Sequence, residues 1–469
     1  MLLLLRKILF YIFFVAYFLI TPYVILYGLG YVFNPKEEGL VKTGLISVAT
    51  HPKGASIYIN GKKFHDKTPT MIGDLVPGNY LMKIDFEGHE PWEKTVTVRP
   101  EKAVAYKHTV LLPKKAKEKK VSTRTYAGMV SDLVDGKIFI WETGAFQDLW
   151  KLDLFFKREQ QVGKSVSGFD SLKLISARSE KNSPLILFDV VTVNGKEQLA
   201  WDFSNEKNKP ILLTPWLNGK VDGFGWDSST GSNLFYAAGG GVGKIDLEKK
   251  QGHPKLAENI LGFGIKEKRL YLLKSDYSLV TVNLKGENPE PLIEDSVLSQ
   301  KIFGTRPDRF YEIKVIKRDL LKNDLILFLG NQGSLITNRL PYSLIDKGVR
   351  GTSYAEEGSG ERVLYWTERE IGVIQFKGEE EQFFQNGPEQ KILYSSGTDI
   401  RKAFWVLEDS HIVFLEGEKI MLLETEGENQ FLARQIANIK STDPVIYRAN
   451  ALYYLDPATN RLIKRELIE

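Results

Sequence analysis

The chain begins with an apolar run that no later segment resembles. Residues 8–33 carry no charged side chain and follow directly on Arg6 and Lys7. As a helix, these residues would extend about 39 Å, which is enough to cross a bilayer with some tilt. The run has no polar face, so it does not suit a helix packed on a globular core. The pattern predicts a membrane-spanning helix over residues 8–33.

A cleaved secretory signal peptide is the alternative interpretation of this run. A signal peptide has a shorter apolar core and a small-x-small cleavage site, and residues 27–31 offer no convincing site. We therefore expect an uncleaved signal-anchor. Because Arg6 and Lys7 precede the run, the positive-inside bias predicts a single-pass protein of the cell membrane, with residues 1–7 in the cytoplasm and residues 34–469 outside it.

Alternation of apolar and polar residues dominates residues 40–112, where Ala55, Ile57 and Ile59 share one face of a predicted strand. Asn60-Gly61 follows directly and supplies the positive φ angles of a tight hairpin turn. Similar short strands continue to the end of this segment. Five or six strands, each with one apolar face, predict a small antiparallel β-sandwich.

The order of these strands and turns resembles the PEGA domain, a family named for a Pro-Glu-Gly-Ala signature at its first turn. The matching stretches, in chain order, are Gly44-Leu45-Ile46-Ser47-Val48, Pro52-Lys53-Gly54-Ala55, Ile57-Tyr58-Ile59-Asn60-Gly61, Thr68-Pro69, Leu75-Val76-Pro77-Gly78-Asn79-Tyr80 and Gly88-His89-Glu90-Pro91. Lys53 replaces the signature glutamate, the glycine usual before Thr68 is missing, and His89 stands where a tyrosine commonly follows the glycine. The resemblance implies a non-catalytic β-sandwich of exported, surface-associated microbial proteins, and it implies no ligand.

The signature turn, Pro52 to Ala55, is explained by turn chemistry. Gly54 permits backbone angles that a Cβ would penalise, and proline presets the φ angle of a turn. A recognition loop formed by Pro52, Lys53, Gly54 and Ala55 is the alternative.

Residues 113–120 separate this predicted domain from the rest of the chain. They hold five lysines and no apolar residue larger than alanine. Such a composition is typical of a solvated, self-repelling linker. The alternative is a salt-sensitive contact of the lysines with an anionic wall polymer or with phospholipid headgroups.

A repeating unit of apolar strand, polar turn and second apolar strand occupies residues 121–469. The first strand of each unit begins near residues 138, 185, 234, 270, 325, 363, 412 and 452, at a mean spacing of about 45 residues. This period, with no helical pattern between the hairpins, is typical of the four-stranded blades of a β-propeller. Glycine-rich segments such as residues 221–226 and 261–264 would be inner strands that pack closely around the axis, and residues 291–293 an outer strand.

The predicted fold is therefore mainly β, with one N-terminal transmembrane helix, a small PEGA-like β-sandwich and a seven- or eight-bladed β-propeller. A pair of β-sandwiches is the alternative for the last part.

Composition narrows the possible chemistry. The chain contains no cysteine, which excludes a disulfide framework, a thiolate zinc site and a cysteine nucleophile, and which suits an exported bacterial protein. Residues 34–124 hold 17 Lys and Arg against 10 Asp and Glu, so a basic neck precedes a mildly acidic head. A location outside the cytoplasm argues against a nucleic-acid partner, despite the net charge of +4.

The sequence offers no convincing metal or cofactor motif, and we predict neither. Residues 239–244 lack the leading glycine and the Ser or Thr of a phosphate loop, so we interpret them as a hairpin turn. The six histidines show no metal-ligand spacing. Asp222, Asp227, Asp276 and Glu368 are expected at turns or blade edges, where they would serve the alternative of a propeller-based carbohydrate hydrolase or lyase.

Four tryptophans, Trp150, Trp216, Trp226 and Trp405, are candidates for stacking on sugar rings, with packing between blades as the alternative for each. An anchor, a spacer, a lysine-rich linker and a broad head together predict a membrane-anchored cell-envelope protein. Its propeller would bind a cell-wall polymer or a protein partner without catalysing a reaction. Self-assembly into a surface layer is a further alternative.

Overall fold

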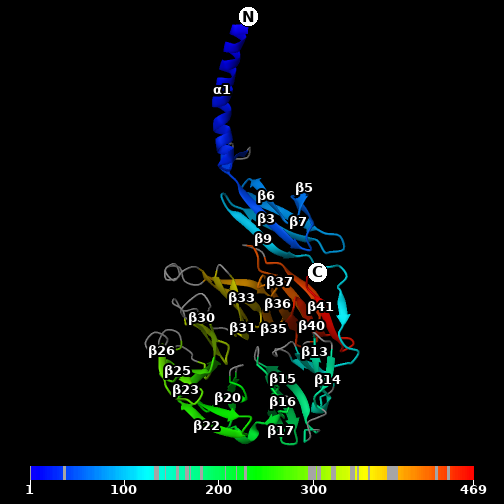
Figure 1. Cartoon of the computed structure of the whole chain (residues 1–469), viewed down its shortest axis with the longest axis vertical. Helices are drawn as coiled ribbons and strands as arrows, with labels where there is room; N and C mark the ends of the chain where they lie inside the picture. The colour runs from blue at the N-terminus through cyan, green and yellow to red at the C-terminus, as the bar shows by residue number, and fades with distance from the viewer. Residues whose placement is uncertain are drawn as a thin grey trace. The chain divides into compact units, whose positions relative to one another are not determined.

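The structure of the chain is a computed structural model, whose helix and strands are shown in Figure 1. It describes residues 2–34, 39–130, 137–142, 144–154, 158–163, 168–169, 171–179, 183–205, 207–217, 219–226, 230–293, 303, 308–317, 324–338, 344–345, 348–357, 360–377, 389–427, 431–440 and 444–468. The chain forms two compact units. The first comprises Met1–Glu118, Leu423–Arg434 and Arg465–Glu469, and the second comprises Lys119–Leu422 and Gln435–Lys464.

The N-terminal apolar run forms helix α1 (Leu2–Gly28). Its part from Leu5 to Gly28 is long and apolar enough to cross a membrane, and none of its most apolar window is buried within the structure. The helix begins before the predicted residue 8, because the leucines that open the chain are strong helix formers.

The helix also ends earlier than predicted, at Gly28 and not at residue 33. Gly30 adopts a left-handed conformation with φ +82°, and its amide donates to the Tyr27 carbonyl, as at many helix C-termini. The chain then forms strand β1 (Tyr31–Asn34), which pairs antiparallel with β2 (Gly39–Lys42).

Seven strands of the first unit form two facing sheets. They are β3 (Gly44–His51), β4 (Ser56–Ile59), β5 (Lys62–Lys67), β6 (Thr70–Leu75), β7 (Gly78–Asp85), β8 (Trp92–Val98) and β9 (Ala103–Val110). The strand orders are β6-β3-β9 and β5-β4-β7-β8, and residues such as Ile46, Ile57 and Trp92 lie fully buried between the sheets. The predicted antiparallel arrangement is wrong for one pair, because β3 and β9 run parallel. The alternation of side chains predicts a buried face but not the direction of the neighbouring strand.

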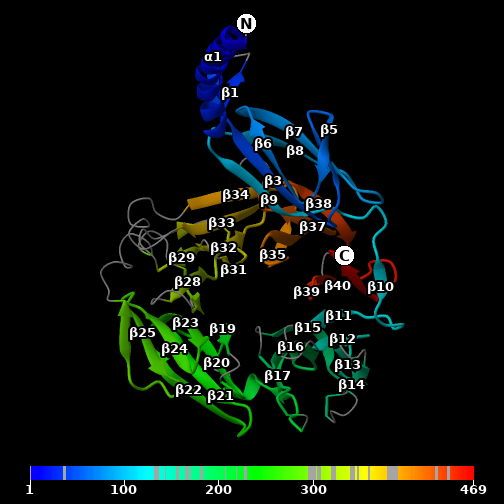
Figure 2. The same ribbon diagram turned by 45° about the horizontal axis from the view of Figure 1, so that its top comes forward.

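The other strands form consecutive groups of four. The first four groups are β11 (Gly128–Val130), β12 (Lys137–Trp141), β13 (Leu149–Asp153) and β14 (Arg158–Gln161); β15 (Lys173–Ser179), β16 (Leu185–Thr192), β17 (Gly195–Asp202) and β18 (Ile211–Leu212); β19 (Val221–Gly225), β20 (Asn233–Ala238), β21 (Gly241–Asp246) and β22 (Gln251–Glu258); and β23 (Ile260–Lys266), β24 (Arg269–Lys274), β25 (Leu279–Asn283) and β26 (Glu290–Ile293). The next three are β27 (Tyr311–Ile316), β28 (Leu325–Gly330), β29 (Leu335–Thr337) and β30 (Leu344–Ile345); β31 (Gly351–Glu357), β32 (Gly360–Trp366), β33 (Glu370–Lys377) and β34 (Glu389–Ser395); and β35 (Ile400–Val406), β36 (His411–Glu416), β37 (Lys419–Glu424) and β38 (Ala433–Asn438). The last joins β39 (Ile446–Arg448), β40 (Ala451–Leu455) and β41 (Leu462–Glu466) to β10 (Glu118–Lys120). Figure 2 shows the groups following one another around a ring.

This ring is a β-propeller, as the repeat of hairpins predicts. Among the described strands there are eight four-stranded groups, and two of them share one eight-stranded sheet. The predicted first strands of the hairpins correspond to β12, β16, β20, β24, β28, β32, β36 and β40. Apolar residues of adjacent groups pack together, so that Phe139 and Phe146 of the first group share a buried cluster with Phe188 and Trp201 of the second.

The glycine-rich segments form inner strands, as predicted. A Cβ on Gly264 would lie 1.9 Å from the Ile313 carbonyl oxygen, and a Cβ on Gly225 would lie 2.8 Å from the Phe263 ring. The inner strands β23 and β27 approach closely enough to pair in parallel. Glycine is required here because a side chain would push neighbouring inner strands apart.

Part of the predicted linker belongs to the propeller. Glu118–Lys120, at the end of the lysine-rich stretch 113–120, is strand β10 and pairs with β41. The amide of Val121 continues this contact by donating to the Leu462 carbonyl. The charged composition did not predict a strand here, because an edge strand is held by main-chain hydrogen bonds and needs no apolar side chain.

The first unit also contains a late stretch of the chain. Leu423–Arg434, which we call the inserted segment, extends from the last residues of β37 to the first residues of β38 and belongs to the same compact unit as the sandwich. Leu432 packs against the core of the sandwich. The predicted boundary at residue 121 therefore does not separate the two units. The inserted segment lies far beyond this boundary in the sequence but belongs to the same unit as the sandwich.

Candidate functional site

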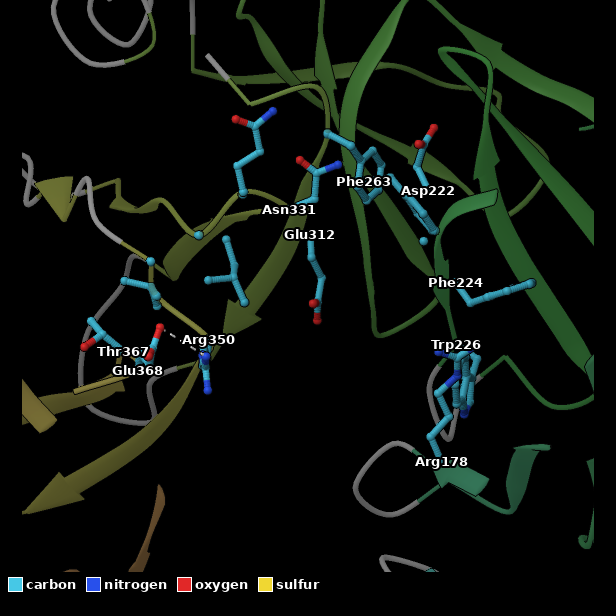
Figure 3. A pocket seen from close by; sticks show the side chains of 18 of the residues that line it. Arg178, Asp222, Phe224, Trp226, Phe263, Glu312, Asn331, Arg350, Thr367 and Glu368 are labelled. Atoms are coloured by element: carbon cyan, nitrogen blue, oxygen red, sulfur yellow. Dashed lines mark ion pairs between the residues drawn. The ribbon is translucent and has the colours of Figure 1, made fainter. Parts of the chain in front are cut away.

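A cavity of about 890 Å³ lies among the inner strands of the propeller. Its lining from these strands comprises Arg178 of β15, Asp222 and Phe224 of β19, Phe263 of β23 and Glu312 of β27. The lining also includes Trp226 and Phe310, Leu329 and Gly330 at the end of β28, and residues 331–333, 348–350 and 367–369 of the connections between strands (Figure 3). The first strand of each group faces the axis, so residues far apart in the sequence converge here.

Ion pairs hold one side of the cavity. Arg350 Nη1 lies 2.5 Å from Asp399 Oδ1, and Arg350 Nη2 lies 3.6 Å from Glu368 Oε2, the pair drawn in Figure 3. Arg369 Nε lies 3.5 Å from Glu368 Oε1. Pairs as exposed as these contribute about 0–1 kcal/mol each to stability.

Arg178 lies on a different side of the cavity from Arg350 (Figure 3). Its guanidinium carbon is 5.7 Å from the centre of the Phe224 ring, and Nη2 is 3.7 Å from Asp189 Oδ1. Half of the Arg178 side chain is exposed, so its guanidinium is accessible in the cavity lining.

The lining is balanced in charge. Three arginines, at positions 178, 350 and 369, face three carboxylates, Asp222, Glu312 and Glu368. Glu312 is 48% exposed and lies 3.6 Å from the Lys314 ammonium, and Asp222 is exposed. A cavity lined by groups of both signs favours a ligand that also carries both signs.

Aromatic rings line the cavity but show little of their faces. Phe263, Phe310 and Trp226 are 3%, 5% and 6% exposed, and Phe224 is partly buried. The first three rings also belong to buried clusters between strand groups. They therefore provide apolar walls, not broad platforms for stacking.

The predicted carboxylates separate into two sets. Asp222 and Glu368 both line the cavity. Asp276 lies elsewhere, where the Ser278 hydroxyl and amide donate to it and lower the pKa of its carboxyl. Asp227 is outside the described residues. The described lining contains no histidine or tyrosine, and no three described His, Asp or Glu residues form a group that suits a metal ion.

Of the four candidate tryptophans, only Trp226 is among the described lining residues of the cavity. Trp150, on β13, lies under the Arg124 guanidinium, 3.8 Å from its carbon, and buried Trp405 has the Arg362 carbon 4.6 Å from its ring. Trp216 packs partly against a cluster between the second and third groups. Contacts within the fold thus account for the placement of these three rings, and a role in ligand stacking stays a prediction.

The signature turn is held by Thr68. The Gly54 amide donates to the Thr68 carbonyl, and the Ala55 amide donates to the Thr68 hydroxyl at 3.0 Å. Gly54 has φ +87°, Ala55 is buried, and Lys53 is exposed. These contacts explain Pro52-Lys53-Gly54-Ala55 as a structural turn between β3 and β4, and recognition by this turn stays an untested alternative.

A buried polar network joins the inserted segment to the sandwich. The Trp92 indole N–H donates to Glu424 Oε2 at 2.7 Å, and Lys94 Nζ lies 3.6 Å from Glu424 Oε1 and donates to the Glu426 carbonyl at 2.8 Å. The side chains of Lys94 and Glu424 are 3% and 1% exposed. Burial raises the pKa of Glu424, although Lys94, the Trp92 N–H and Arg434 act in the opposite direction.

Sequence reasoning did not identify Arg178, Glu312 and Arg350 as cavity residues. One signal was available at Glu312, because its neighbours in the strand, Tyr311 and Ile313, are apolar and buried while Glu312 is exposed between them. A charged residue in an inner strand must point away from the packed interfaces and toward the axis. Arg350 precedes its strand and had no comparable signal.

A comparison with known protein families identifies one domain in the chain. The PEGA domain model matches residues 43–113. This part of the chain is a PEGA domain. The resemblance of its strands and turns to that family is thereby confirmed, with closely similar bounds. No curated protein sequence matches the chain significantly.

Several solved structures are similar to the chain at low sequence identity. PorZ of Porphyromonas gingivalis, described as an essential surface component of the type-IX secretion system, is 12% identical with a TM-score of 0.35, over 72% of this chain and 42% of that protein. YCF48 from Cyanidioschyzon merolae is 11% identical with a TM-score of 0.37, over 75% of this chain and 99% of that one. The computationally designed Ika8 protein is 10% identical with a TM-score of 0.42, over 74% and 96% of the two chains. All three TM-scores lie below 0.5, so these similarities carry no conclusion about this chain.

Proposed function

We propose that this is a membrane-anchored, non-catalytic binding protein of the cell envelope, and that the propeller cavity takes an extended segment of a protein partner. Helix α1 would hold the chain in the cell membrane, with residues 1–7 in the cytoplasm. The PEGA domain and the propeller would then lie on the outer side.

The charge balance of the cavity carries this proposal. Three arginines and three carboxylates line it; Glu368 is paired with Arg350 and Arg369, whereas Arg178, Asp222 and Glu312 lie elsewhere in the lining. A polypeptide offers side chains of both signs together with amide donors and acceptors. A polyanionic wall polymer would meet Asp222, Glu312 and Glu368 with like charge, and like-charge contacts oppose binding. A protein partner therefore suits this lining better than such a polymer.

The aromatic residues support the same choice. Sugar recognition by stacking needs an exposed ring face, and Trp226 is 6% exposed. A hydrolase or lyase would need positioned groups for proton transfer. The described lining offers carboxylates, of which Glu368 is engaged by Arg350 and Arg369, but neither histidine nor tyrosine. We therefore favour binding over catalysis.

Photo-crosslinking of the full chain in the cells that produce it tests the proposal. p-Benzoylphenylalanine would replace Asn331, an exposed residue of the cavity lining, and Val193, which is 99% exposed in the turn between β16 and β17, would be the control site. We expect a protein adduct from position 331 but not from position 193. Adding Arg178→Glu should reduce the yield at least fivefold, because it reverses a charge at the wall.

Two outcomes would overturn the proposal. One is an adduct at position 331 that is removed by a muralytic enzyme but not by protease, since it would identify a wall polymer. The other is an equal yield at positions 331 and 193, since it would mean that the cavity selects no partner.

A further inference from the structure

The strands that follow the anchor expose apolar side chains. β1 and β2, which we call the juxtamembrane hairpin, carry Phe33 and Leu40 with 57% and 48% of their surface exposed. Leu29, just before the hairpin, is 64% exposed. Isolated exposed apolar residues are common, but these three lie within a short stretch directly after α1.

The pairing of the hairpin places the apolar residues on one face. Phe33 and Leu40 lie opposite each other, and Tyr31 lies opposite Lys42. Residues two apart along a strand point to the same side, so these four side chains share a face. The alternate residue Asn34, on the other face, is 7% exposed. The hairpin thus turns an apolar pair outward while its polar residue Asn34 is buried.

The hairpin is joined to the end of α1 by more than the connecting chain. The Gly30 carbonyl accepts hydrogen bonds from the Thr43 amide at 2.8 Å and from the Thr43 hydroxyl at 3.1 Å. These bonds hold the base of the hairpin beside the helix end. Whenever α1 spans a bilayer, the exposed pair is therefore kept close to the membrane surface.

The remaining residues of this face suit the interfacial region of a bilayer. Lys42 Nζ lies 5.4 Å from the centre of the Tyr31 ring, and Lys42 also pairs with Glu101. Tyrosine and lysine favour this region, because each combines an apolar body with a polar end that reaches water or headgroups. Phe33 and Leu40 would then lie next to the acyl chains.

We propose that the juxtamembrane hairpin docks its Phe33–Leu40 face into the phospholipid interface of the membrane that α1 crosses. This inference rests on the proposed membrane anchoring. The Phe33–Leu40 face would contact lipid, because lipid is the apolar phase that necessarily surrounds the end of a spanning helix. The hairpin adds a second contact with the bilayer to the contact made by α1.

The absence of cysteine allows a direct test on the full chain. Single substitutions Phe33→Cys and Leu40→Cys would be labelled with the fluorophore NBD in vesicles of phosphatidylcholine and phosphatidylglycerol. Val193→Cys is the aqueous control, and Leu19→Cys, inside α1, reports whether the helix is inserted. Phe33, Leu40 and Val193 are all exposed, so their replacement should not disturb a packed core.

We expect shallow nitroxide lipids to quench the labels at positions 33 and 40 at least twofold, with a blue-shifted emission, and to leave position 193 unchanged. Deep nitroxide lipids should quench position 19. If position 19 is quenched while positions 33 and 40 behave like position 193, the docking proposal is wrong but anchoring by α1 is supported. If position 19 is also unquenched, the anchoring proposal fails together with the docking.

Discussion

Replacing Glu424 by alanine should destabilise the PEGA domain, although this residue lies far from it in the sequence. The Glu424 carboxylate accepts the Trp92 indole N–H at 2.7 Å and lies 3.6 Å from the Lys94 ammonium. Both charged side chains are almost completely buried. Without the carboxylate, the indole N–H loses its acceptor and the Lys94 charge loses the anion beside it.

The expected loss is about 3 kcal/mol in the free energy of local unfolding. Removing one partner of a buried ion pair costs about 3–5 kcal/mol, because the other charge stays out of water. Lys94 keeps a hydrogen bond to the Glu426 carbonyl at 2.8 Å and lies 5.0 Å from the centre of the Tyr106 ring. A desolvated cation above an aromatic ring is stabilised by about 2 kcal/mol, so we place the cost at the lower end.

Hydrogen exchange of the β8 and β9 amides in the full chain measures this effect. Two compact units make a single unfolding midpoint ambiguous, whereas exchange reports the opening of one segment. Lys94→Met should also destabilise these strands, and the double variant Lys94→Met/Glu424→Ala should lose less than the sum of the two single variants, with a coupling of about 0.5–3 kcal/mol. Lys83→Met, on the exposed side of β7, is the matched control.

The reasoning would be refuted if Glu424→Ala changed the opening free energy of the β8 amides by less than about 0.5 kcal/mol, the range of ordinary surface substitutions. That result would mean that the inserted segment rests against the sandwich without contributing to its stability. An additive double variant would show that Lys94 and Glu424 do not act as a pair.

Two further predictions concern titration and packing. Because burial raises the pKa of Glu424, the folded chain binds a proton on this carboxyl more tightly than the unfolded chain does. This contribution to stability is present below the unfolded pKa and is lost as the pH rises through the raised value, so Glu424→Gln should flatten the dependence of PEGA-domain stability on pH, measured by pulse proteolysis upward from the unfolded pKa. A slope that is unchanged in Glu424→Gln would contradict this assignment. Gly264→Ala should lower the opening free energy of the β23 and β27 amides measured by hydrogen exchange, because its Cβ would lie 1.9 Å from the Ile313 carbonyl oxygen and forced repacking costs about 1–3 kcal/mol or more. Gly397→Ala, where a Cβ meets nothing within 4 Å, is the control, and equal opening free energies for the two variants would argue against close packing of the inner strands.

Local patterns were sufficient to predict most of the elements. The apolar run predicted α1, and the spacing of the hairpins predicted strands such as β12, β20 and β40 close to their observed starts. The turns of the PEGA domain were readable because Gly54 and Asn60 take positive φ angles that few residues tolerate. Inner strands were recognisable because only glycine fits where neighbouring inner strands approach. Each of these features depends on residues close together in the sequence.

Only the tertiary structure decided how distant stretches meet. Trp92 and Glu424 are separated by 332 positions, and no periodicity links them. The parallel pairing of β3 with β9 and the strand formed by Glu118–Lys120 likewise depend on main-chain partners elsewhere in the chain. The balanced charge of the cavity arises because several inner strands and connections contribute single residues to one space. The period of apolar residues shows which side of a strand is buried. Long-range packing decides which surfaces come together, and the candidate site lies where several strands and connections are brought together in this way.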